Sequence, residues 1–332
     1  MLKIAVAGVG RIGKMHAEII ARQTANAQLV AVADINEDAA KSIAGQLQVE
    51  HATVDQLFTA SNIDAIAICT STDTHVELIE KAAKAGKAIF CEKPLSLDVE
   101  KVDQSLRAVD AANVPFMVGF NRRFDPGHKS VRDAVQSKAI GEVHLARITS
   151  RDPAPPPIEY IKVSGGIFMD MTIHDFDMAR YVVGSPVVEV FAMGAVLVDP
   201  RIGEAGDIDT AVVTLKHLNG AMTVIDNSRQ AVYGYDQRVE VFGSAGMAIS
   251  DNPRSHNGSV FSETKVQDQN LPYFFLERYT ASYINEWAAF VEYVLNGGPS
   301  PVSGLDGKAP VILGLAAKES VRTGNPVKVD GV

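Results

Sequence analysis

The feature that most constrains the fold is a glycine motif that directly follows a short apolar run. Residues 4–7 are continuously apolar, the motif Gly8-x-Gly10-x-x-Gly13 comes next, and residues 14–23 have a helical pattern. In such a strand–turn–helix unit the first glycine permits a tight turn, the second lets a pyrophosphate approach the backbone, and the third packs helix against strand. The motif therefore predicts a parallel sheet that binds a dinucleotide at its first turn, although a glycine-rich turn without a ligand is the simpler alternative.

Asp34 is the acidic residue that a dinucleotide site needs, because it ends the next apolar run at residues 29–33. Its carboxylate can accept hydrogen bonds from both ribose hydroxyls and would repel a 2′-phosphate, which favours NAD over NADP. The helix that opens in the glycine motif offers free N–H groups and a positive dipole end to the phosphates. We expect Arg11 and Ile12, between the glycines, to contact the cofactor with them.

The pattern of apolar runs changes near residue 120. Before it, expected strands at residues 65–69, 88–91 and 116–118 are separated by helices, which is typical of a parallel sheet covered on both faces. After it, longer and partly alternating strands are expected at residues 143–150, 187–198, 210–216, 221–226 and 237–242, with a hairpin signal at Asn219-Gly220 and helices at 166–183 and 278–295.

We therefore expect an α/β protein with two domains. Residues 1–120 would form an N-terminal Rossmann dinucleotide-binding domain, and residues 121–332 a C-terminal α+β domain with an open, mainly antiparallel sheet. Helices can cover only one face of such a sheet. If the other face is apolar, another subunit is expected to cover it.

Composition narrows the class of partner. The net charge is −9 and there is no basic tract, which argues against nucleic acid and against an anionic membrane surface. No apolar run approaches 18 residues and the chain enters a strand at Lys3, so we expect neither a membrane span nor a signal peptide. Cys69 and Cys91 are the only cysteines, too few for a disulfide framework or a zinc set, and are expected to be reduced thiols in a cytoplasmic protein.

Residues 70–75 mark a second crossing of the sheet edge. Ser71, Thr72 and His75 follow the strand at residues 65–69, where ligands bind at the carboxyl edge of parallel sheets. Their side chains could hold the ribose on the nicotinamide side. The alternative is that Ser71, Thr72 or Asp73 only caps the helix that follows.

Lys93 and three residues at helical spacing suggest the chemistry. Lys93 lies in Glu92-Lys93-Pro94 at a strand end, and Asp170, His174 and Asp177 share one face of the expected helix. Oxidation of an alcohol needs a base, for which His174 is suited. Asp170 could orient the imidazole, and Lys93 could stabilise charge on the reacting oxygen.

Simpler readings remain for each of these residues. The helix face could be solvated and bonded within itself, and Lys93 could pair with an acidic residue such as Glu92. Two carboxylates and a histidine could also bind a divalent ion. No further Cys or His ligands cluster nearby and hydride transfer needs no metal, so we expect none.

These motifs together resemble the glucose-fructose oxidoreductase / inositol dehydrogenase family. The resemblance rests on the glycine motif, residues 69–75, Glu92-Lys93-Pro94, residues 119–124 and residues 165–177, which span about half the chain. Within the family, residues 150–156 and 169–175 are most similar to inositol dehydrogenases. The resemblance implies a cis bond before Pro94 and commonly a homotetramer built on the open sheet.

The resemblance also implies roles for individual residues. Lys93, Asp170 and His174 match the family's catalytic set, in which His174 is the acid/base and Lys93 contacts the reacting hydroxyl. The matching substrate-binding positions are Lys93, Arg122, Asp152, Asp170, His174, Asp177 and Tyr235, and Glu92 matches a cofactor-binding position. Tyr233 is an alternative to Tyr235, and an amide is also found at the position of Asp152.

The resulting hypothesis is NAD-dependent oxidation of myo-inositol to scyllo-inosose. A polar, uncharged polyol suits a pocket of Asp, Arg, Tyr and His side chains. The alternatives are another cyclitol or a pyranose sugar, a glycoside hydrolase that uses NAD transiently, and an NAD-binding sensor without chemistry. The presence of a base argues against the sensor.

Overall fold

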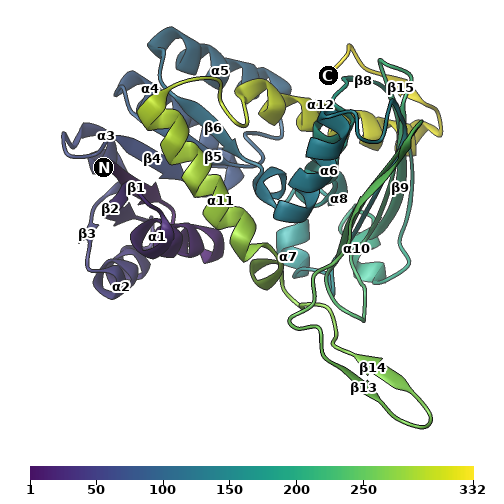
Figure 1. Cartoon of the computed structure of the whole chain (residues 1–332). Coiled ribbons are helices and arrows are strands. Elements are labelled where there is room, and N and C mark those ends of the chain that lie inside the picture. Colours follow the sequence, from purple (N-terminus) through teal and green to yellow (C-terminus); the bar gives the residue numbers. More distant parts are fainter. The chain divides into compact units, whose positions relative to one another are not determined.

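The computed structural model describes residues 1–332, and its chain passes between two units (Figure 1). Residues 1–121 and 281–311 form the first unit, and residues 122–280 and 312–332 form the second. The sequence analysis placed residues 281–311 with the second domain. They belong to the first unit because buried side chains there pack on its sheet and because the Val118 N–H donates to Val302 O at 3.0 Å.

Six parallel strands form the sheet of the first unit, in the order β3-β2-β1-β4-β5-β6. The strands are β1 (Leu2–Ala7), β2 (Ala27–Ala33), β3 (Glu50–His51), β4 (Ala65–Ile68), β5 (Ala88–Glu92) and β6 (Phe116–Gly119). The connections contain α1 (Arg11–Gln23), α2 (Glu37–Leu47), α3 (Val54–Thr59), the short η1 (Thr72–Thr74), α4 (His75–Lys84) and α5 (Val99–Ala112). This confirms the expected Rossmann arrangement, in which the strand order reverses between β1 and β4.

Burial of both faces explains why apolar and polar residues do not alternate along these strands. Every residue of β4, β5 and β6 is buried, because helices cover both faces of a parallel sheet. Polar side chains mark the helix starts instead. Asn36 Oδ1 accepts the Ala39 N–H at 3.1 Å to cap α2, and Thr53 and Gln56 form a reciprocal capping box at α3.

Seven strands form the sheet of the second unit, in the order β12-β11-β7-β10-β9-β8-β15, and only the β7–β10 pair is parallel. The strands are β7 (Val143–Arg151), β8 (Val187–Ala195), β9 (Thr210–His217), β10 (Met222–Ser228), β11 (Asp236–Gly243), β12 (Gly246–Ser250) and β15 (Val327–Lys328). The unit also contains α6 (Pro126–Gln136), α7 (Ile158–Ile161), α8 (Ile167–Asp170), α9 (Thr172–Val183) and α10 (Pro200–Glu204). The expected mainly antiparallel sheet and the hairpin at Asn219-Gly220 are confirmed.

The two faces of this sheet differ in what covers them. Side chains such as Val213, Ile225 and Val239 point into a core that α6, α8 and α9 complete. The alternate residues on the same strands point the other way, where apolar side chains remain exposed. This open face includes Met193, Val212, Met222, Phe242, Met247 and Ile249.

The helix expected at residues 166–183 is two helices. Met171 separates α8 from α9 with φ −102° and ψ −60°, so Asp170 ends one helix and His174 lies in the next. Gly166 has φ +83°, and a Cβ there would lie 2.7 Å from Asp207 Oδ1. The carboxylate of Asp207 therefore approaches the backbone at Gly166 more closely than a side chain there would allow.

Three further elements complete the chain. Helix α11 (Phe275–Asn296), expected at residues 278–295, has a non-helical residue, Tyr279 (φ −113°, ψ 15°), near the point where the chain changes unit. Helix α12 (Gly304–Thr323) also contributes to both units. The hairpin of β13 (Ser259–Phe261) and β14 (Val266–Asp268) was not foreseen; all its strand residues are exposed, and Figure 1 shows it extending away from the seven-stranded sheet. No helix is long and apolar enough to cross a membrane.

Buried ion pairs tie the helices of the second unit together, and one of them yields a stability prediction. Arg123 Nε and Nη2 both donate to the carboxylate of Asp177, at distances from 2.6 to 3.1 Å, and both residues are buried. Asp177→Asn should lower the apparent free energy of unfolding by about 3–5 kcal/mol, because the buried guanidinium loses its countercharge. Urea denaturation of the full chain measures this.

The matched control is Asp133→Asn. Asp133 pairs with Lys129 at 2.7 Å, but both side chains are more than half exposed, so the change should stay within about 0.5 kcal/mol. Equal effects of the two substitutions would contradict the importance of burial at Asp177.

Candidate active site

The glycine motif forms a turn against the end of β4 in the first unit. Gly8 has φ +88°, and a Cβ there would lie 2.7 Å from the carbonyl of Cys69. A Cβ on Gly13 would lie 1.9 Å from Gly8 O, so the helix could not approach the strand with any side chain. At Gly10 a Cβ would meet nothing within 4 Å. Gly10 thus faces open space, as a residue next to a pyrophosphate would.

The start of α1 and Asp34 complete a site that fits NAD. No side chain caps α1 and no acidic residue lies in its first turn, so its positive end remains available to phosphates. Asp34 is held by two backbone amides: the Val9 N–H donates to Oδ2 at 2.7 Å and the Asn36 N–H to Oδ1 at 2.8 Å. Arg11 is exposed and Ile12 is half-buried at the same turn.

In residues 70–75, which follow β4, no side chain caps a helix. Neither η1 nor α4 has a side-chain cap, so the hydroxyls of Ser71 and Thr72 are not used in that way. His75 is buried and its ring bridges two carbonyls, Pro94 O at 2.9 Å from Nδ1 and Thr70 O at 3.1 Å from Nε2. Burial lowers the pKa of His75, against the two carbonyl bonds that raise it. The ring therefore links this crossing to the segment after Lys93, and its contact with the cofactor stays a prediction.

The Glu92-Lys93-Pro94 motif follows β5 in the same unit. The Lys93–Pro94 peptide is cis, as the resemblance implied. Lys93 is half-buried and Glu92 is buried. Glu92 Oε1 lies 2.7 Å from His16 Nε2, and Oε2 accepts the Lys93 N–H at 3.2 Å. The carboxylate of Glu92 is thus bonded within the protein.

A buried polar cluster occupies the covered side of the sheet in the second unit. Arg122 Nη1 donates to Asp175 Oδ1 at 2.8 Å and to Ser150 Oγ at 3.0 Å, and its Nη2 lies 3.5 Å from Tyr235 OH. Asn227 Nδ2 donates to the other oxygen of Asp175 at 2.8 Å. The cluster brings together Arg122 and Tyr235, two of the predicted substrate-binding residues.

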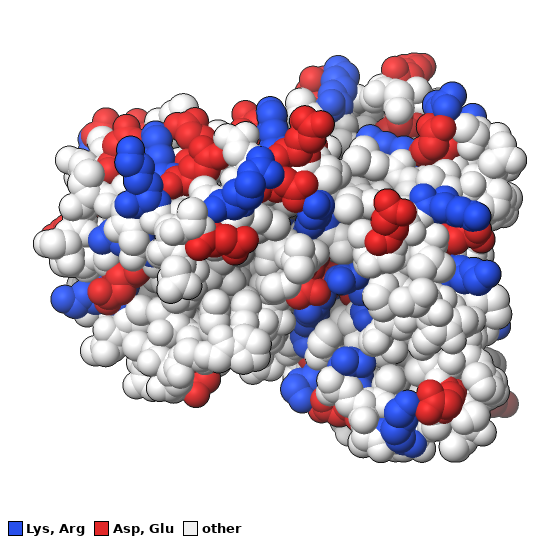
Figure 2. Space-filling model, turned by 90° about the horizontal axis from the view of Figure 1, so that it is seen from above, with Lys and Arg blue, Asp and Glu red and all other residues white.

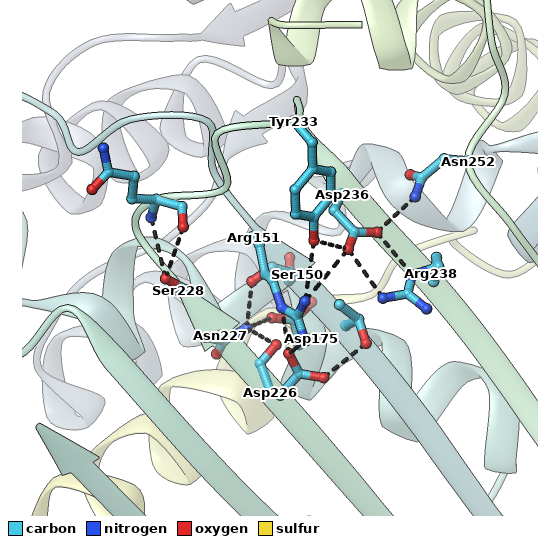
Figure 3. A network of polar contacts seen from close by, with 12 residues as sticks. Ser150, Arg151, Asp175, Asp226, Asn227, Ser228, Tyr233, Asp236, Arg238 and Asn252 are labelled. Carbon is cyan, nitrogen blue, oxygen red and sulfur yellow. Dashed lines mark hydrogen bonds and ion pairs between the residues drawn. The ribbon is translucent and has the colours of Figure 1, made fainter. Parts of the chain in front are cut away.

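Tyr233 bonds to a different set of side chains, which Figure 3 draws together with Ser150, Asp175 and Asn227. Its hydroxyl donates to Asp236 Oδ2 at 2.7 Å and accepts from Arg151 at 3.1 Å, and Arg151 also pairs with Asp226. Tyr233 is about half exposed, whereas Tyr235 is buried beside Arg122. Of the two tyrosines that the sequence left open, Tyr235 is therefore the one beside the predicted site residues.

Asp170 and His174 lie on either side of the Met171 break. Asp170 Oδ1 accepts from Tyr160 OH at 2.8 Å and Oδ2 from Arg229 Nη1 at 3.1 Å. His174 is half-buried, while every other residue from 171 to 179 is buried. His174 is thus the residue of this stretch of α9 that a substrate could reach. Asp177 is buried and bound by Arg123, so its substrate contact stays a prediction.

Arg229 was missed by the sequence analysis. It is fully buried and joins Asp170 to Asp207, whose Oδ2 lies 3.3 Å from Nη2. A single arginine after a strand has no motif, so nothing in the sequence distinguished it. Asp175 was missed for a similar reason, because the helical pattern singled out Asp170, His174 and Asp177.

Lysine and arginine side chains are interspersed with aspartate and glutamate on the face shown in Figure 2. Several exposed pairs join residues one turn apart, such as Lys41 with Glu37 and Lys138 with Glu142. Such pairs contribute little to stability. They leave no broad surface of one sign on this face.

Gly10 gives a direct test of the nucleotide site. Gly10→Ala should leave the melting temperature within about 2 °C, because a Cβ meets no protein atom, yet weaken NAD binding at least about tenfold, because the methyl group enters the space for the pyrophosphate. Calorimetric titration with NAD measures this. Gly45→Ala is the control, since a Cβ at Gly45 also meets nothing and Gly45 lies in α2, away from the glycine motif in sequence. Equal NAD affinity in both variants would exclude Gly10 from the site.

Asp152 gives a test that does not depend on turnover. Burial raises the pKa of Asp152 to about 6 and the charge of Asp170 adds to it, while Arg122 and Arg229 oppose the rise. The folded protein therefore holds a proton that the unfolded chain releases, and stability falls as pH rises from about 4 to about 6. Above that window the penalty is about 3 kcal/mol.

Asp152→Asn should remove this penalty. The variant should be more stable than the wild type at pH 8, by at most about 3 kcal/mol, and this difference should vanish below about pH 3, where the carboxyl is neutral in both the folded and the unfolded wild type. Thermal unfolding across this pH range measures the difference. A constant difference between the two proteins at every pH would contradict the raised pKa.

In a comparison with known proteins, each of the two parts of the chain matches a family model of its own. Residues 2–120 match the model described as "Oxidoreductase family, NAD-binding Rossmann fold", and residues 128–249 match the "GFO/IDH/MocA C-terminal domain". The chain is 51% identical to the myo-inositol 2-dehydrogenase of Thermotoga maritima, over 100% of this chain and 99% of the relative.

Two solved structures extend the comparison. The myo-inositol dehydrogenase of Corynebacterium glutamicum superimposes with a TM-score of 0.95 at 40% identity and covers 100% of both chains. The scyllo-inositol dehydrogenase of Lactobacillus casei, solved with NAD(H) and scyllo-inositol, superimposes with a TM-score of 0.92 at 29% identity over 99% of each chain. The chain therefore belongs to the GFO/IDH/MocA family of NAD-binding oxidoreductases.

Proposed function

We propose that this protein is an inositol 2-dehydrogenase that oxidises myo-inositol to scyllo-inosose with NAD. The observation that carries the proposal is full-length similarity, at 51% identity, to a myo-inositol 2-dehydrogenase, in a chain that retains Lys93, Asp170 and His174. Relatives named for scyllo-inositol are more distant, at 35% identity in Bacillus subtilis. The substrate is therefore proposed as myo-inositol, with other cyclitols and pyranoses as alternatives.

The side chains of the second unit suit a polyol. Arg122 and Arg229 supply donors, Asp152 supplies acceptors, and Tyr235 supplies both, so several hydroxyl groups of a ring can be satisfied at once. Asp175 and Asp207 neutralise the two arginines. A polar, uncharged substrate suits a cluster whose charges are already paired.

The proposed reaction assigns one task to each catalytic residue. His174 takes the hydroxyl proton, because imidazole is the side chain best matched to proton transfer near neutral pH. Asp170, held by Tyr160 and Arg229, orients the imidazole and stabilises its protonated form. Lys93 contacts the same oxygen and stabilises its developing charge. NAD, when bound, accepts the hydride from the carbon.

The first test is absorbance of NADH with purified protein, NAD and a panel of cyclitols and aldoses. NADH formation with myo-inositol well above that with glucose supports the proposal. Absence of NADH with every polyol, despite NAD binding, would favour a hydrolase that recycles its cofactor or a sensor. Lys93→Met and His174→Asn should each lower kcat at least about 1,000-fold with NAD affinity retained. Loss of NAD binding in the His174 variant would contradict its assigned role.

We also propose that the chain forms a homotetramer through the open face of the seven-stranded sheet. Exposed Met222, Phe242 and Ile249 lie on this face, and exposed apolar side chains on an uncovered sheet face are typical of an interface. A self-complementary sheet face suits a two-fold interface between identical chains. Light scattering should give four times the chain mass of 35.6 kDa.

Phe242→Asp should reduce the measured mass, because it places a charge in the contact. Leu305→Asp should not, although Leu305 is also exposed, because it lies at the start of α12 rather than on the sheet. A wild-type monomer, or a Phe242 variant that keeps the full mass, would contradict this interface.

A further inference from the structure

A chain of hydrogen bonds runs through the interior of the first unit and ends at Lys93. Trp287, the only tryptophan in the sequence, lies fully buried on α11, and its Nε1 donates to His16 Nδ1 at 2.8 Å. His16, on α1, contacts Glu92 Oε1 through Nε2 at 2.7 Å, and Glu92 Oε2 accepts the Lys93 N–H at 3.2 Å. These bonds therefore connect α11 and α1, through Glu92, to the backbone of Lys93.

The direction of each bond is determined by Trp287. An indole N–H can only donate, so His16 Nδ1 must accept. A ring whose Nδ1 accepts carries its proton on Nε2, and that proton is donated to Glu92. Glu92 then accepts one N–H at each oxygen, which is what an ionised carboxylate does. The tautomer of His16 therefore follows from the donor chemistry of Trp287.

Aromatic packing holds the side chains of this hydrogen-bond series rigidly. The centroid of the Trp287 ring lies 4.6 Å from the centroid of Phe90 and 5.5 Å from that of Phe290. The ring of His16 packs edge-on against Phe90, with 5.3 Å between the two centroids. All four side chains are fully buried. Hydrogen bonds in such an apolar interior are stronger than in water, and a broken one is more costly.

Glu286 lies next to Trp287 in sequence and behaves in the opposite way to Glu92. Its side chain is fully buried, and neither carboxyl oxygen has a hydrogen-bond partner in the structure. Burial, followed by the negative charge of Glu92, holds the pKa of Glu286 well above its usual range. Burial therefore favours the neutral acid at Glu286, whereas both oxygens of Glu92 lie within hydrogen-bond distance of nitrogen atoms.

We propose that Trp287, His16 and Glu92 are positioning residues for Lys93, acting through the hydrogen bond that the Lys93 backbone N–H donates to Glu92. This inference rests on the proposed function, in which Lys93 contacts the reacting oxygen. It also changes the role expected for Glu92 from a cofactor ligand to a support for Lys93. Because a displacement of about 1 Å at a reacting group can cost about 100-fold in rate, a support of this kind should be visible in kcat.

The matched variants are Glu92→Gln and Glu286→Gln. Glutamine has one acceptor oxygen and one donor nitrogen, so at position 92 it can serve either His16 Nε2–H or Lys93 N–H but not both. At position 286 the amide has the shape and neutral charge of the acid that it replaces. The same substitution at two neighbouring buried carboxyls should therefore have opposite results.

Steady-state kinetics with myo-inositol and calorimetric titration with NAD give the first readout. Glu92→Gln should lower kcat about 10- to 100-fold and change the Kd for NAD less than about twofold. Glu286→Gln should keep both within about twofold. The inference is overturned if Glu92→Gln keeps the wild-type kcat, if it weakens NAD binding as much as it lowers kcat, or if both variants lose activity equally.

Amide hydrogen exchange, followed by mass spectrometry, tests the same bonds without turnover. Exchange in the peptide that contains Lys93 should be at least about tenfold faster in Glu92→Gln and in Trp287→Phe than in Glu286→Gln or the wild type. Trp287→Phe keeps an aromatic ring and removes the indole N–H. Unchanged exchange in both Glu92→Gln and Trp287→Phe would overturn the inference. An inactive wild type with the expected exchange pattern would instead refute only the proposed dehydrogenase activity.

Discussion

Pairing of buried charges is the constraint on which the second unit depends. Arg122 binds Asp175, Arg123 binds Asp177, Arg278 binds Asp125, and Arg229 joins Asp170 to Asp207. Each arginine is buried, and a buried charge without a partner costs several kcal/mol. The pairs hold the ends of α6 and α8 and residues of α9 in place, and they include Arg122, Arg229 and Asp170, to which the proposed function assigns contacts with a polyol.

Asp152 is the exception among these carboxyls. No arginine is paired with it directly, and burial raises its pKa to about 6. A group that is unfavourable for folding and lies beside the proposed catalytic residues is typical of a functional site, where stability is given up for chemistry. Burial raises the pKa of Asp175 as well, against Arg122, Asn227 and Ser150, which lower it. The two carboxyls therefore differ in their partners, since Arg122 and Asn227 donate directly to Asp175.

A different constraint applies in the first unit, where the backbone must come close to a large anion. Gly8 and Gly13 allow contacts that no side chain would permit, and the open space at Gly10 remains. In the same unit, burial and then the nearby Glu92 raise the pKa of Glu286 well above its usual range. Lys93 lies at the end of this arrangement, so the hypothesis about its role links the cofactor domain to the proposed reaction.

The sequence by itself determined the local features. The glycine turn, the acidic residue after β2 and the change from buried to alternating strands follow from short-range rules, and the fold shows them. The cis bond at Lys93–Pro94 was implied by the family resemblance and is also present. Only the tertiary structure decided what depends on residues far apart in the chain. These features are the break between two helices at Met171 and the inclusion of residues 281–311 in the first unit. They also include the contacts of Arg229 with Asp170 and of Trp287 with His16. The physical reason is that a buried polar group must find its partner in space, and sequence spacing carries no record of that partner.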